Sequence, residues 1–148
     1  MTDRELIRSL VRRHLRRASG FVVAAEGSPL PVGAEPDEVR LGDYRNPAPW
    51  EAHTLVFTDV ALYAEGRPPT YRLRWADVVD YELPPSKEGS VGVRILTPSG
   101  FAFARMAGTA GPTGNVKDVF GLIMILKTLA ERRRREVRAE GDDVEPRP

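Results

Sequence analysis

Residues 53–106 form short runs in which apolar and polar side chains alternate. A period of two is typical of β-strands that have one buried face and one solvated face. Turn-forming residues separate the runs, notably Thr58-Asp59 and Pro98-Ser99-Gly100. This pattern predicts an antiparallel sheet of several short strands, and such a sheet needs another element to cover its apolar face.

The first predicted hairpin lies within residues 53–66 and turns at Thr58 and Asp59, whose side chains can bond to nearby backbone. We expect these two residues to have no role beyond the turn. Strand alternation places the core side chains on one face: His53, Leu55, Phe57, Leu62 and Ala64.

The second predicted hairpin lies within residues 91–106, and its turn has proline second and glycine last, as type I turns prefer. Between the hairpins, residues 71–75 and 78–83 are predicted strands joined by a bend. The core face of the second hairpin is predicted to hold Val91, Val93, Ile95, Ala102, Ala104 and Met106.

Proline marks the segment before the first hairpin, since residues 27–52 contain five of the thirteen prolines. Proline removes backbone donors, so most of this segment is predicted to be loop. Short strands are predicted at 21–27 and around 39–44. The acidic side chains here are predicted to form a solvated patch: Glu35, Asp37, Glu38 and Asp43.

An N-terminal helix is predicted over residues 2–20, because Thr2 and Glu5 form a capping-box pattern and Gly20 is a stop signal. Its apolar face holds Leu6, Ile7, Leu10, Val11, His14 and Ala18. Its basic face holds Arg8, Arg12 and Arg16, with Arg13 and Arg17 beside them.

A long C-terminal helix is predicted to follow the N-cap residue Asn115. It carries two apolar stripes, which is more apolar surface than one sheet can cover. The first stripe comprises Val116, Val119, Phe120, Ile123 and Leu126, and the second comprises Leu122, Ile125 and Leu129. We therefore predict that the N-terminal helix docks on the second stripe, in the same chain or from a second copy.

These elements predict an α+β fold, and three segments resemble the pleckstrin-homology-like superfamily, particularly its bacterial PH-like and GRAM-like members. The segments are "LVFTDVALYAEG", "YRLRWADVVDYEL" and "GVRILTPSGFAFARM" with the helix after it. The resemblance covers about residues 53–130. It implies a strongly bent antiparallel sheet, or a partly open barrel, of about seven strands capped by the C-terminal helix. The N-terminal helix and the Pro-rich stretch depart from the family pattern.

The expected organisation is an Arg-rich helix at 1–20, a PH-like domain at 21–137 and a flexible tail at 138–148. A chain without cysteine has no thiolate metal site or catalytic thiol. The two histidines, His14 and His53, stand outside any catalytic or metal-binding motif. We therefore expect no enzyme activity, no metal and no cofactor.

Other features bear on localisation and on general classes of ligand. The net charge of +1 does not favour a nucleic-acid-binding protein. The longest apolar run, residues 121–126, is too short to span a bilayer, which takes about 20 residues. The N-terminal residues lack the apolar core of a signal peptide. We expect a soluble cytoplasmic protein.

The first candidate binding surface lies on the outer face of the second hairpin, where alternation brings together Phe101, Phe103, Arg94 and Arg105. Either the N-terminal segments cover this face, or it is an exposed aromatic and cationic surface that binds a partner.

The second candidate surface is the arginine cluster Arg12, Arg13, Arg16 and Arg17. It is either a solvated helix face or a contact for anionic lipid, nucleic acid or an acidic partner. The same two alternatives apply to Arg132–Arg135, which are expected at the end of the last helix. The glycine-rich segment 108–114 is interpreted as a connection, although a helix start with Lys117 nearby could also hold an anion.

A PH-like fold implies binding of peptide, protein or lipid. The sequence therefore favours a non-catalytic binding or interaction module whose partner is a protein. The alternative is contact with an anionic membrane or nucleic acid through the Arg-rich helices. A homo-oligomer formed through the terminal helices is a further expectation.

Overall fold

The computed structural model describes residues 2–83, 92–107 and 116–143. These residues form two helices, eight strands and one short 3₁₀ turn. In chain order the elements are α1 (Asp3–Leu15), β1 (Phe21–Val23), β2 (Arg40–Arg45), β3 (His53–Thr58), β4 (Ala61–Gly66), β5 (Tyr71–Arg74), η1 (Trp75–Asp77), β6 (Asp80–Glu82), β7 (Gly92–Thr97), β8 (Gly100–Arg105) and α2 (Val116–Asp143).

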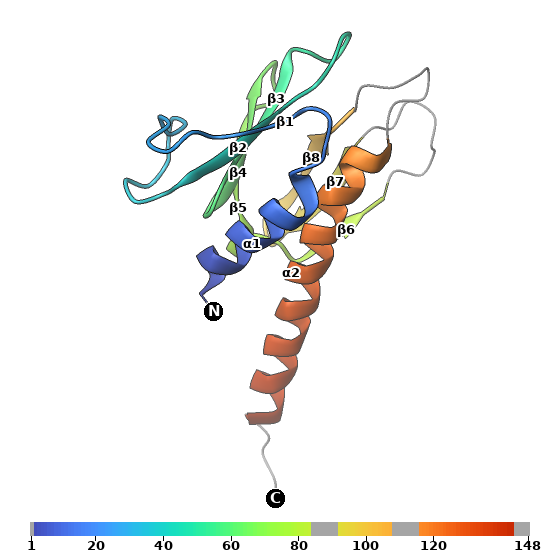
Figure 1. Ribbon diagram of the computed structural model, residues 1–148. Coiled ribbons are helices and arrows are strands. Elements are labelled where there is room, and N and C mark those ends of the chain that lie inside the picture. Colours follow the sequence, from blue (N-terminus) through green and yellow to red (C-terminus); the bar gives the residue numbers. More distant parts are fainter. Residues whose placement is uncertain (1, 84–91, 108–115, 144–148) are drawn as a thin grey trace, which may run out of the picture.

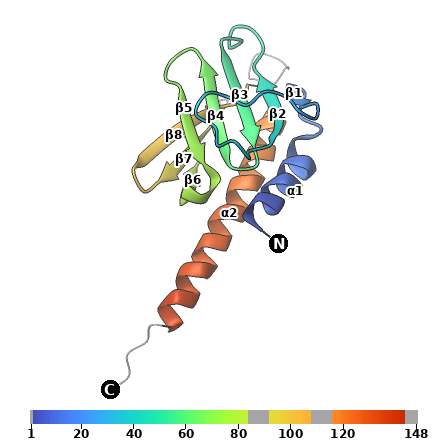
Figure 2. The ribbon, with the colours of Figure 1, turned by 90° about the vertical axis from the view of Figure 1, so that its left-hand side faces the viewer.

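The strands form two antiparallel sheets, one with the order β1-β2-β3-β4-β5 and one with the order β6-β7-β8. Figure 1 shows the two helices side by side, with α2 packed against the smaller sheet. Figure 2 shows the larger sheet as a curved meander above α1. Over the described residues the sheets do not close into a barrel, and there is one strand more than the seven expected.

The strand registers confirm the predicted faces of both hairpins. Leu55 pairs with Ala64 and Phe57 pairs with Leu62, so these side chains point to the same side of the sheet. In the second hairpin, Val93 pairs with Ala104, and both are buried. Val91 lies outside the described residues. One core therefore joins the inner faces of both sheets to the apolar sides of α1 and α2.

Helix α1 begins as predicted, because the Thr2 hydroxyl accepts the Glu5 N–H at 3.2 Å and the Glu5 carboxylate accepts the Thr2 N–H at 2.9 Å. The helix ends at Leu15, earlier than the expected end near Gly20. The backbone N–H and the hydroxyl of Ser19 both donate to Asp118 on α2, and these bonds hold the chain in a turn after the helix.

The prediction that the two helices pack together is confirmed, and both belong to the same chain. They approach closely at Gly121 of α2, where an added Cβ would lie 2.4 Å from the carbonyl oxygen of His14. Leu122 and Ile125 are fully buried there. Phe120, predicted for an apolar stripe that faces the sheet, is instead 54% exposed.

Helix α2 continues to Asp143, so the expected flexible tail starts within helix. Figures 1 and 2 show that the C-terminal part of α2 extends beyond the sheets. The arginines predicted to end the helix lie well inside it. Arg132 pairs with Asp3 at 3.0 Å and Arg134 pairs with Asp80 at 3.2 Å, so these side chains connect α2 to α1 and to β6.

Candidate functional site

The outer face of β7 and β8 is the most exposed aromatic surface that the structure describes. Phe101 is 64% exposed and Phe103 is 40% exposed, so the N-terminal segments do not cover them. Arg94 pairs with Phe103 in the register, and its guanidinium lies 4.5 Å from the centre of the Phe101 ring. The four side chains predicted to share this face do so, and we call them, with Trp50, the aromatic–arginine surface.

Arg105 lies between two aromatic rings, with its guanidinium 4.2 Å from the centre of Trp50 and 5.4 Å from the centre of Phe103. Burial lowers the pKa of this guanidinium. No carboxylate of the described residues pairs with it, whereas Arg94 has Glu82 at 3.4 Å. A partly desolvated guanidinium that has no carboxylate partner among the described residues is well suited to form an ion pair with a carboxylate of another protein.

Asn46 positions this part of the surface. Its buried side-chain amide donates to the carbonyl oxygens of His53 and Arg105, at 2.8 and 3.1 Å, and accepts the Ala107 N–H at 2.7 Å. The end of β8 is therefore fixed beside the start of β3. No sequence pattern indicates this role, because a single Asn in a Pro-rich loop has many other uses.

Trp50 was not predicted as a site residue. The loop that carries it folds into consecutive turns. The Trp50 N–H donates to the carbonyl oxygen of Pro47, and the Trp50 carbonyl oxygen accepts the His53 N–H. A large aromatic residue in a segment otherwise rich in Pro and polar residues was the available signal. Its contact with Arg105 joins segments that lie more than 50 residues apart.

A cleft of about 410 Å³ borders the aromatic–arginine surface at Phe101 and separates β5 from the turn between β7 and β8. On its β5 side, the Tyr71 hydroxyl donates to the carbonyl oxygen of Phe103 at 3.0 Å. Burial raises the pKa of Tyr71, so this phenol is a stable donor at neutral pH. The cleft adds concave surface next to an exposed aromatic ring, as protein-binding sites often have.

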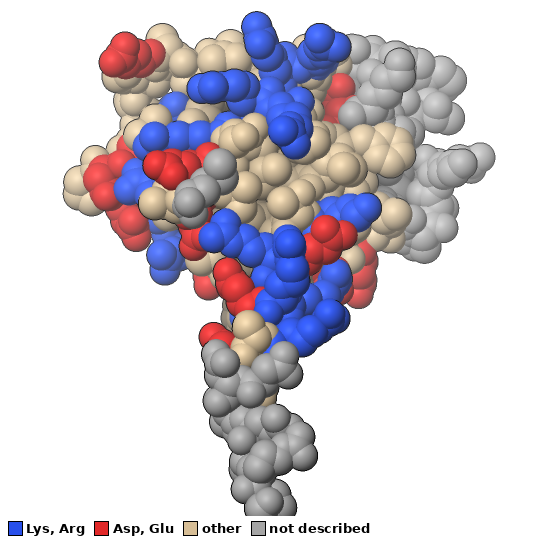
Figure 3. All heavy atoms as spheres, turned by 60° about the horizontal axis from the view of Figure 1, so that its bottom comes forward, with Lys and Arg blue, Asp and Glu red and all other residues tan. Residues whose placement is uncertain are grey.

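The second candidate surface is also assembled in the structure. Arg12, Arg13, Arg16 and Arg17 are exposed and together line a hollow of about 510 Å³. Within the described ranges these four arginines form no ion pair. Figure 3 shows basic side chains gathered over α1 and, separately, over the exposed part of α2.

Arg4 and Arg8 of the same helix are used differently. Asp59 is buried and accepts from both guanidinium groups, at 3.1 Å from Arg4 and 2.8 Å from Arg8, while Arg4 also pairs with Asp37 at 2.7 Å. The Val39 N–H donates to Asp59 as well, at 2.9 Å. The expectation that Asp59 only turns the chain is wrong, because it also holds α1 against the sheet.

The apolar face of α1 is unavailable to a membrane. Ile7, Leu10, Val11 and Leu15 are all buried in the core. An amphipathic helix that lies in a bilayer surface needs a free apolar face. Any contact of α1 with an anionic ligand must therefore use its exposed arginines.

The predicted acidic patch is solvated only in part, because Glu35 and Asp37 are exposed but Glu38 and Asp43 are not. Glu38 is buried and accepts hydrogen bonds from Thr58 at 2.6 Å and from Tyr63 at 2.5 Å, and Arg72 pairs with it at 3.2 Å. Burial raises the pKa of Glu38, but these bonds outweigh it and the pKa is lowered overall. Asp43 pairs with Arg40 at 2.6 Å. These carboxylates are saturated with donors, which suits a structural role.

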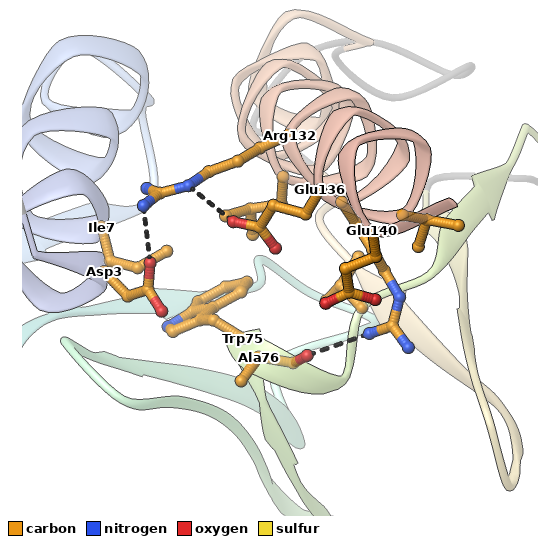
Figure 4. Close-up of a pocket in the computed structure, with 11 residues that line it drawn as sticks. Asp3, Ile7, Trp75, Ala76, Arg132, Glu136 and Glu140 are labelled. Atoms are coloured by element: carbon orange, nitrogen blue, oxygen red, sulfur yellow. Dashed lines mark hydrogen bonds and ion pairs between the residues drawn. The ribbon is translucent and has the colours of Figure 1, made fainter. Parts of the chain in front are cut away.

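A hollow of about 320 Å³ lies between the two helices and η1. Figure 4 shows Arg132 reaching from α2 to Asp3, with Trp75 and Ala76 below. Arg132 also contacts Glu136 at 3.4 Å, and Arg133 donates to the carbonyl oxygen of Ala76 at 3.1 Å. Asp3, Arg132 and Glu136 pair with one another here, whereas Glu140 lines the hollow without an ion pair to a described residue.

His14 and His53 belong to separate environments. Burial and the neighbouring Arg13 lower the pKa of His14, and burial with Arg105 and Arg67 lowers the pKa of His53. In the part of the chain that the structure describes, no three acidic or histidine side chains are arranged to hold a metal ion. The glycine-rich segment 108–114 lies outside the described residues, as does the N-cap Asn115. None of the described helices has the length and hydropathy needed to cross a membrane.

Comparison with known proteins gives no significant similarity: no family model, no curated protein and no solved structure matches this chain.

Proposed function

We propose that the chain is a non-catalytic, PH-like module that binds another protein through the aromatic–arginine surface. In support, the described part of the chain has eight strands followed by α2, close to the seven or so strands and one helix that the resemblance implies, and α1 is additional. The supporting fold feature is this order of elements, together with the packing of α2 against the smaller sheet.

One observation supports the binding surface above others. Two phenylalanines remain exposed on the outer face of β8, and each lies near an arginine guanidinium. Arginine and aromatic residues are enriched at the energetic centres of protein interfaces. Full burial of a phenylalanine side chain contributes about 1.5–3 kcal/mol, so a partner that covers both rings gains substantial binding energy.

Crosslinking tests this proposal directly. A photoreactive phenylalanine analogue at position 101 is expected to crosslink to a partner protein in extracts of the native cell. The same analogue at Phe120, an exposed phenylalanine on α2, is the matched control and should not crosslink to that partner.

The double substitution Phe101→Ala and Phe103→Ala should then abolish capture of the crosslinked partner. Both rings are exposed, so the melting temperature should fall only slightly. A folded double variant that captures the partner as well as the native protein does would refute the proposed surface.

A further inference from the structure

A groove beside the arginine cluster forms a second surface, independent of the aromatic–arginine surface. It has a volume of about 590 Å³ and lies between α1 and the first two strands. Arg12 and Arg16 line both this groove and the hollow of the arginine cluster, so the two are continuous. Its apolar lining residues are Val11, Phe21, Val23, Ala24, Val39 and Leu41.

The apolar part of the groove is accessible to a ligand. Val23 is 65% exposed and Val39 is 43% exposed, although both belong to a folded sheet region. Two other arginines at the groove are already neutralised, since Arg8 pairs with Asp59 and Arg40 pairs with Asp43. Arg12 and Arg16 are the groove cations that remain without an acid among the described residues.

Strand β1 adds a third feature, because it is the edge of the larger sheet. Gly20 accepts the Arg45 N–H and Ala24 donates to Leu41, so these backbone groups point toward β2. By alternation, the N–H and C=O groups of Val23 point away from β2, where no described strand pairs with them. An open strand edge can accept an extended chain from another protein.

We infer that this groove binds an extended acidic segment of a partner protein. The segment would pair with the edge of β1, place an aliphatic side chain against Val23 and Val39, and bring carboxylates to Arg12 and Arg16. The unpaired arginines match acidic side chains, and the apolar surface matches an aliphatic one. The open backbone edge matches a polypeptide, which distinguishes this occupant from a lipid or a nucleic acid.

Selection from a displayed library of random linear peptides tests the inference, with counter-selection against the double variant Arg12→Gln and Arg16→Gln. The recovered peptides are expected to combine acidic and aliphatic residues. A synthetic peptide of the recovered sequence should bind the double variant on the order of tenfold more weakly than the native protein. Its affinity should also decrease as salt is added.

The matched control is the double variant Arg135→Gln and Arg138→Gln, which removes the same charge from exposed positions of α2. It should bind the peptide as the native protein does. Val23→Pro removes an N–H that points away from β2, so it should lower the affinity for the peptide and leave the fold intact. Val23→Asp adds a carboxylate that repels an acidic peptide, so it should lower the affinity as well.

Four results would overturn the inference. The selection could yield no peptide that depends on Arg12 and Arg16, or both arginine double variants could weaken binding equally. Full affinity in a folded Val23→Pro variant would exclude pairing with the strand edge. Finally, phosphatidylserine vesicles or a single-stranded oligonucleotide could bind through Arg12 and Arg16 while no peptide does, which would assign these arginines to a different ligand.

Discussion

Three carboxylates of the described residues are buried, and each one joins segments that are far apart in the sequence. Glu38 connects a loop to β3, β4 and β5, and Asp59 connects α1 to the larger sheet. Asp118 accepts from Ser19 at 2.8 Å and from the Tyr44 hydroxyl at 2.6 Å, so it joins α2 to β2. Hydrogen bonds to charged groups contribute about 1.5–3 kcal/mol each, which makes these positions sensitive to substitution.

Glu38→Gln should lower the free energy of unfolding by about 1–3 kcal/mol, because the amide cannot accept at both ends of the side chain. Chemical denaturation measures this change. The matched control is Glu35→Gln, an exposed residue of the same turn, which should alter stability by less than about 0.5 kcal/mol. Equal effects of the two substitutions would contradict a structural role for the buried carboxylate.

At the scale of the elements, the close contact between α1 and α2 at Gly121 gives a second stability prediction. Gly121→Ala should destabilise the protein by more than about 1 kcal/mol, because its Cβ would meet backbone and Leu15 at 2.4–2.8 Å. Gly141→Ala is the control, since nothing lies within 4 Å of its Cβ. In an exposed helix this change should be stabilising by up to about 1 kcal/mol. Thermal denaturation measures the stability of both variants. A Gly121→Ala variant as stable as the native protein would contradict the close packing.

The elements themselves were largely predictable from the sequence. Alternation identified which side chains share a face in each hairpin. Successive side chains of a strand point to opposite faces, so the apolar–polar pattern of the sequence shows the face directly. The helix pairing followed from the excess apolar surface of α2. The early end of α1 was missed, since it depends on bonds from Ser19 to Asp118, 99 positions away in the chain.

The candidate sites were predictable only in part, for the same reason. The four residues on β7 and β8 share a face by alternation, which a sequence displays. Trp50 reaches Arg105 through loop turns that carry no periodicity. Arg8 has an ion-pair partner and Arg12 has none among the described residues. Which arginine is paired depends on where Asp59 lies in three dimensions, and the sequence does not show this.

At the scale of the whole molecule, the two proposed binding surfaces lie on different parts of the fold. No buried side-chain nitrogen or oxygen of the described residues lacks a hydrogen-bond partner. The aromatic–arginine surface belongs to the smaller sheet and Trp50, whereas the groove belongs to α1, β1 and β2. Because the two sites share no residue, the double substitution of Phe101 and Phe103 should leave binding at the groove unchanged.

The stability of the whole chain should rise with pH from acid to neutral in two steps. The pKa of Glu38 is lowered below its ordinary value of 4.5, and burial lowers the pKa of His14 and of His53 below 6.5. In both cases the unfolded state binds protons more readily, so stability is lost as pH falls through each range. The upper step should begin near pH 6.5 and the lower one near pH 4.5. Replacing both histidines with glutamine should remove the upper step and keep the lower one, as followed by melting temperature against pH. A native profile that is flat between pH 7 and pH 5 would show that the folded state does not disfavour protonated histidine.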